Sequence, residues 1–154
     1  MNWERTVHIV DPTVLELLRA SGWDVDRKVD ISEWVAKLEA AGYAMNRESR
    51  RVLSSFGGLT VLPATFDRQV YSPSPVRFDP LLLRWLGRPT PWEQKLGTVL
   101  SPLGECHEDS SLFIDEAGRL YAQWDALMEC EGESFEDSLR TLLLADRRGR
   151  RVVL

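Results

Sequence analysis

Cysteine and histidine are scarce in this chain of 154 residues. It has two cysteines, Cys106 and Cys130, and two histidines. Two cysteines are too few for a disulfide framework, so we expect reduced thiols, although pairing between the two stays open. A metal site needs several converging ligands, whereas Cys106 and His107 are adjacent and would point to opposite faces of a strand. We therefore expect a buried thiol beside an exposed histidine, with no metal and no cofactor.

Long apolar runs are also missing. The longest, such as Leu81-Leu82-Leu83, fall far short of the length that spans a membrane. The first residues lack a basic start followed by an apolar stretch and a cleavage site, so we expect an unprocessed, cytoplasmic protein with no membrane partner. The net charge of −5 argues against direct nucleic-acid binding. Hydrophobic residues still make up 44% of the chain, which is enough for one domain with a real core over residues 1–154.

Common catalytic signatures are absent as well. The chain has no Gly-x-Ser-x-Gly, no Walker spacing around Gly57-Gly58 and no zinc-deaminase pattern. Carboxylate pairs such as Glu108-Asp109 and Asp115-Glu116 perform acid–base chemistry only in a sheltered pocket. Because charged side chains are rarely buried, we expect these carboxylates to be solvated, and we predict no enzymatic activity.

What the chain does contain is a series of capped amphipathic segments. Asp11-Pro12 and Asn46 are typical helix starts, and each is followed by apolar residues at helical spacing. Further helices are predicted after Asp30, Asp79, Thr90 and Ser134, the one after Asp79 ending at Gly87. Strands are predicted at Leu59–Leu62, within Thr65–Tyr71 and at Gly97–Leu100, the last ending before Pro102. The order indicates an α+β single domain, with helices packed on a largely antiparallel mixed sheet.

The clearest strand signal is a hairpin. Leu112–Ile114 is a short apolar run, and Asp115–Gly118 has the composition of a turn. Apolar and polar residues alternate along the return strand Leu120–Trp124, which predicts one face in the core and one face in water.

Charge is distributed unevenly along the chain. The segment Glu105–Asp137 has eleven acidic residues and one basic residue, Arg119, a local charge of −10. The segment Ser138–Leu154 has five arginines and one aspartate, a local charge of +4. The acidic segment is either a solvated face that aids solubility or a docking surface for a basic partner.

Four motifs together resemble one bacterial family. They are Gly22-Trp23 with Arg27, LSSFGGL at Leu53–Leu59, Pro102-Leu103-Gly104-Glu105, and LFIDEAGRLY at Leu112–Tyr121. Because these motifs occur in this order between about Val14 and Leu144, the chain resembles the SUKH superfamily. The resemblance is to the branch that is usually listed third. The resemblance implies an α+β fold with helices around a mixed sheet. It also implies a non-enzymatic immunity protein that neutralises a polymorphic toxin, often a nuclease or deaminase.

The resemblance and the charge pattern together predict a basic toxin as the protein partner. The predicted partner-binding residues are the carboxylates Glu105, Glu108, Asp109, Asp115, Glu116, Glu129, Glu131 and Glu133. Two alternatives stay open: a general protein-binding or regulatory module of the same fold, and a small metal-dependent enzyme built on clustered carboxylates. The oligomeric state is not indicated by the sequence.

Overall fold

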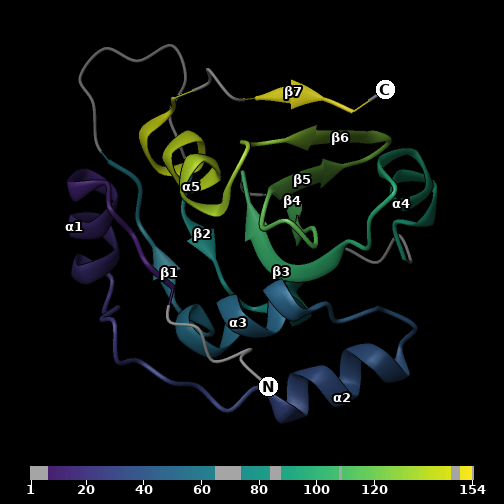
Figure 1. The fold of residues 1–154 in the computed structure, drawn as a ribbon, viewed down its shortest axis with the longest axis horizontal. Coiled ribbons are helices and arrows are strands. Elements are labelled where there is room, and N and C mark those ends of the chain that lie inside the picture. Colours follow the sequence, from purple (N-terminus) through teal and green to yellow (C-terminus); the bar gives the residue numbers. More distant parts are fainter. Residues whose placement is uncertain (1–6, 65–73, 84–87, 108, 147–149, 154) are drawn as a thin grey trace.

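The fold is a sheet with helices around it (Figure 1). A computed structural model describes residues 7–64, 74–83, 88–107, 109–146 and 150–153. Five α-helices, one 3-10 helix and a seven-stranded sheet make up this part of the chain. The protein is therefore a single α+β domain, as the sequence predicts. No helix in the described residues is long and apolar enough to cross a membrane.

Three helices begin at the caps predicted from sequence. In α1 (Pro12–Ala20), Asp11 accepts hydrogen bonds from two backbone amides of the first turn. Asn46 and Ser134 accept one each at the starts of α3 (Arg47–Phe56) and α5 (Phe135–Leu144). These side chains satisfy amides that have no partner inside the helix, which is why the predicted starts are correct.

Two other helices begin differently from the prediction. The Asp30 side chain accepts from the Ser32 amide, but α2 (Ser32–Ala40) has Ile31 at its cap position. In α4 (Thr90–Leu96), Thr90 is the first helical residue and makes no capping bond. The predicted helix after Asp79 is a single 3-10 turn, η1 (Pro80–Leu82), and residues 84–87 lie outside the described part.

The sheet has its strands in sequence order. They are β1 (Thr60–Val61), β2 (Val76–Arg77), β3 (Ser101–Cys106), β4 (Ser110–Ile114), β5 (Leu120–Trp124), β6 (Leu127–Cys130) and β7 (Arg151–Val152). Every neighbouring pair is antiparallel. The prediction of a largely antiparallel sheet is confirmed, while the strand predicted within Thr65–Tyr71 lies outside the described residues.

The course of β3 differs from the prediction. The predicted strand at Gly97–Leu100 is wrong, because these residues are not in a strand. The strand β3 instead begins at Ser101 and includes Pro102, Leu103 and Gly104, which were predicted to follow the strand. The register between β3 and β4 shifts between Pro102 and Gly104, which marks a bulge. Bulges bend the strand that contains them, and Figure 1 shows β3 strongly curved. The bend explains how a proline and a glycine fit within a central strand.

The hairpin is present as predicted, but its return strand is covered on both sides. Leu120, Tyr121 and Ala122 are all buried, and only Gln123 and Trp124 are partly exposed. The prediction that alternate residues of this strand face water is therefore wrong for Tyr121. The last strand, β7, pairs with β6 at the edge of the sheet, with Val152 opposite Glu129.

An aromatic cluster holds the helices to the sheet. Phe56 of α3 stacks on Trp23 at 5.2 Å between ring centroids. It also contacts Phe78 at 5.3 Å and Phe135 of α5 at 5.5 Å. Trp23, Phe56, Phe78 and Phe135 are all buried, so one ring at the end of α3 joins the α1–α2 connection, the β2 end and α5. Such ring pairs add to the free energy gained by burying their area.

Candidate functional site

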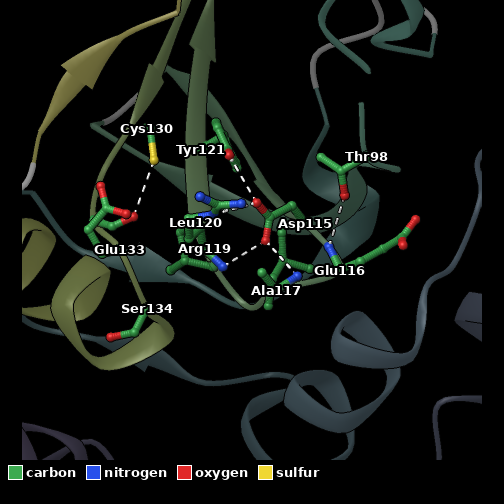
Figure 2. A network of polar contacts seen from close by, with 12 residues as sticks. Thr98, Asp115, Glu116, Ala117, Arg119, Leu120, Tyr121, Cys130, Glu133 and Ser134 are labelled. Atoms are coloured by element: carbon green, nitrogen blue, oxygen red, sulfur yellow. Dashed lines mark hydrogen bonds and ion pairs between the residues drawn. The ribbon is translucent and has the colours of Figure 1, made fainter. Parts of the chain in front are cut away.

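The β4–β5 turn is organised around a buried carboxylate. Asp115 is 0% exposed, and its Oδ1 accepts hydrogen bonds of 2.9 Å from the amides of Ala117 and Arg119. Its Oδ2 accepts from Arg119 Nε and from the Tyr121 hydroxyl, each at 2.9 Å. Figure 2 shows these donors converging on one side chain. Burial raises the pKa of Tyr121, so this phenol stays protonated and donates.

This arrangement overturns the expectation that Asp115 is solvated. Four donors surround its two oxygens, and no part of the residue is exposed to a partner. A buried carboxylate with this many donors stabilises a turn, since leaving any donor unpaired costs free energy. The neighbouring Glu116 is exposed, and its Oε1 accepts from the Val99 amide at 3.2 Å.

Carboxylates in β6 and just after it are paired with arginines from the C-terminal tail. Arg150 contacts the carboxylate of Glu129, and its Nε lies 3.7 Å from Glu131 Oε2. Arg151 contacts Glu133 in the same way. The acidic segment and the basic tail, which are separate in sequence, therefore lie side by side where β7 pairs with β6. Much of the local charge is compensated within the protein.

Glu131 is the second predicted carboxylate that is fully buried. Its residue exposure is 0%, and its Oε1 lies 3.4 Å from His107 Nε2. Its Oε2 has no hydrogen-bond partner among the described residues and faces Arg150. His107, which was predicted to be exposed, lies against Glu131 and has a side chain that is only 16% exposed. Glu131, one of the predicted partner-binding carboxylates, is therefore buried inside the protein.

The other predicted carboxylates differ in exposure. Glu105 is mostly covered and its Oε2 lies 3.7 Å from Arg77 Nη1. Asp109 is exposed at the β3–β4 turn, and Glu108 lies outside the described residues. The exposed members of the predicted set are thus Asp109, Glu116 and Glu133.

Both cysteines are free and buried. Burial raises the pKa of the Cys106 thiol well above its ordinary value, and the nearby Glu131 and Glu105 carboxylates raise it further. Burial also raises the pKa of Cys130, whose thiol donates to the Gly132 carbonyl at 3.2 Å. The described residues contain no group of three or more side chains arranged to hold a metal ion.

A groove that the sequence reading missed lies beside α2 and α3. We call it the α2–α3 groove; it has a volume of about 850 Å³. Its walls are Val25 and residues 27–32, the α2 residues Val35, Ala36 and Glu39, the α3 residues Arg47, Arg50, Arg51, Ser54 and Ser55, and Val7. The sequence offered one signal, Val25 and Val29 within a connection that otherwise reads as polar.

The comparison with known families identifies the chain. A family model described as SUKH-3 immunity protein matches residues 10–145. The chain belongs to the SUKH-3 immunity protein family. This confirms the resemblance drawn from the four motifs. No curated protein and no solved structure matches the chain.

Two of the motifs that carry the SUKH-3 likeness meet in space. Trp23 Nε1 donates to Ser55 Oγ at 2.9 Å. Arg27 donates to the carbonyls of Ser55 and Gly57 at 2.7 and 2.8 Å. A Cβ at Gly57 would lie 2.5 Å from the Leu53 carbonyl oxygen, so this position needs glycine. These residues join the α1–α2 connection to the end of α3, and two of them, Arg27 and Ser55, line the α2–α3 groove.

Proposed function

We propose that this SUKH-3 protein binds a cognate polymorphic toxin and neutralises it by direct contact, with no catalytic step of its own. The observation that carries the proposal is the family match over residues 10–145. Inhibition by contact needs a stable surface rather than reactive groups. The described residues fit this requirement, because their thiols are buried with raised pKa values and the predicted carboxylates that are buried are hydrogen-bonded or ion-paired.

The proposed toxin is a nuclease or deaminase with a basic surface. The net charge of −5 supports this choice, because complementary charge speeds the association of two proteins. Among the predicted carboxylates, Asp109, Glu116 and Glu133 are the candidates for contact, since their side chains are exposed. Asp109 and Glu116 flank the two ends of β4, which at about 3.3 Å per residue is roughly 17 Å long. A partner that touches both must cover the whole hairpin, as an interface of ordinary size does.

Co-expression with the toxin encoded beside this protein tests the proposal. We expect the wild-type chain to protect cells from the toxin and to co-purify with it. The double variant Asp109→Lys/Glu116→Lys should associate more slowly, with a loss that shrinks as salt is added. The matched control is Glu16→Lys/Glu33→Lys, which reverses two exposed carboxylates on α1 and α2. If cells still die with the wild-type protein present, the proposed immunity function is ruled out. Equal association rates for the two double variants would remove only the acidic contact.

A further inference from the structure

Three hydrogen bonds to backbone carbonyls fasten one wall of the α2–α3 groove to α3. The amide of Val29 donates to the Ser54 carbonyl at 2.8 Å, which fastens the segment 25–32 to α3. Arg27 adds the two bonds to the Ser55 and Gly57 carbonyls. The wall formed by segment 25–32 is therefore fixed to the α3 wall, and the groove is present without a ligand. A preformed site loses less conformational entropy on binding than a site that must be ordered.

The floor and lip of the groove are apolar. Val25 is 51% exposed, Ala36 on α2 is exposed, and Val29 and Ile31 are half-buried. An isolated exposed valine is ordinary, but these residues line one concavity with Val35 beneath them. Apolar side chains gathered in a groove indicate a site for an apolar group of a ligand.

The charged residues around the groove are mainly basic. Five of the charged lining residues are basic and two are acidic, a net charge of +3 in a chain whose total is −5. Lys28 and Arg47 are exposed. Two other basic lining residues are ion-paired at 2.7 Å, Arg50 with Glu39 and Arg51 with Glu48. The Arg50 and Glu39 side chains are 38% and 50% exposed. The groove thus combines an apolar floor with a positive rim, which is opposite in sign to the protein as a whole.

We propose that the α2–α3 groove binds a segment of the cognate toxin that presents apolar side chains flanked by carboxylates. This inference rests on the proposed function and adds a contact to it. The basic residues of the rim would pair with carboxylates of the segment, and its apolar side chains would pack on the apolar floor between them. A protein segment fits better than a small molecule, because the groove is walled by three elements and most of its lining residues are open to solvent. Amphipathic segments dock in such grooves through a few apolar anchors.

Substitutions at exposed lining residues test the groove without touching the core. Ala36→Trp places a large ring in the groove, and Lys28→Glu/Arg47→Glu reverses the rim. Ala20→Trp is the matched control for the first, since Ala20 is exposed on α1 and does not line the groove. Arg19→Glu/Lys95→Glu is the matched control for the second, with exposed side chains on α1 and α4. Circular dichroism and melting temperature confirm that all four variants fold.

The probe is the purified, catalytically inactivated domain of the toxin that the proposed function expects to be encoded beside this protein, and the readout is affinity by calorimetry. We expect both groove variants to bind at least about tenfold more weakly than wild type, equivalent to about 1.4 kcal/mol, and both controls to bind as wild type does. Hydrogen exchange on the wild-type complex should show new protection in residues 25–32 and in α2. This measurement needs no variant.

The outcomes separate the two proposals. If wild-type protein neither binds nor protects against the toxin, the proposed function fails and the groove inference fails with it. If wild-type protein binds, but the groove variants bind equally well and residues 25–32 gain no protection, only the groove inference fails. If the wild-type protein is a dimer that Ala36→Trp converts to a monomer, the occupant is a second copy of this chain, which also overturns the inference.

Discussion

The Tyr121 hydroxyl donates a 2.9 Å hydrogen bond to Asp115 Oδ2, and both residues are buried. Asp115 follows the last residue of β4, and Tyr121 lies on β5. This bond therefore links the end of β4 to β5 in the interior, and Arg119 Nε makes a second link to the same carboxylate from the turn. The most conspicuous acidic turn in the sequence is thus built on an internal carboxylate, and its neighbour Glu116 is the residue that a partner can reach.

Replacing Asp115 should destabilise the fold far more than replacing Glu116. Asp115→Ala leaves Arg119 and the Tyr121 hydroxyl without their acceptor, so we expect a loss of about 3–5 kcal/mol in the free energy of unfolding. Glu116→Ala removes an exposed side chain and its one hydrogen bond from the Val99 amide, so it should cost no more than about 1 kcal/mol. Urea denaturation of both variants measures the difference. Similar losses in the two variants would contradict the structural role given to Asp115.

Local features of the fold were predictable from sequence. Asp11, Asn46 and Ser134 cap helices where expected, because a capping side chain acts within three residues of its own position. The hairpin at Leu112–Trp124 was predictable for the same reason, since its turn residues lie next to its strands. These signals need no knowledge of distant contacts.

Contacts between distant residues were not predictable from a single sequence. The acidic segment looked like one surface, but pairing of β7 with β6 places Arg150 and Arg151 against three of its glutamates. Glu131 is buried next to residues that are distant in sequence, His107 and Arg150. The α2–α3 groove was missed because it depends on how Arg27 and Val29 fasten one segment to α3.

The two tail arginines should differ sharply in their effect on stability. Arg150 is the cation beside the fully buried Glu131, and only 16% of its side chain is exposed. Arg150→Ala leaves that carboxylate buried without its counter-charge and should cost about 3 kcal/mol or more. Arg151 and Glu133 are 47% and 58% exposed, so Arg151→Ala should cost less than about 1 kcal/mol. Thermal unfolding of the pair checks this ranking, and equal melting temperatures would show that Glu131 does not depend on Arg150.

The two thiols should be unreactive in the native protein. Only the thiolate attacks an alkylating agent, and burial raises the pKa of both Cys106 and Cys130, so the thiolate fraction near neutral pH is small. We expect iodoacetamide to label the native protein far more slowly than the protein in guanidinium chloride, with the native rate rising only at alkaline pH. Mass spectrometry counts the added groups and identifies the labelled cysteine. Rapid labelling of either native thiol at neutral pH would contradict its buried position.

The bend in β3 should depend on Gly104. A Cβ at this position would lie 1.8 Å from the Arg77 carbonyl oxygen, and β2 backbone cannot give way there without losing its pairing with β3. Gly104→Ala should therefore cost about 4 kcal/mol or more, among the largest effects of single substitutions. Gly97→Ala is the matched control: Gly97 also has a positive φ, of 66°, but an added Cβ meets nothing within 4 Å. That variant suffers backbone strain alone, about 1–2 kcal/mol. Urea denaturation gives both values, and a Gly104→Ala loss no larger than that of Gly97→Ala would mean that β2 does not hold β3 in its bent course.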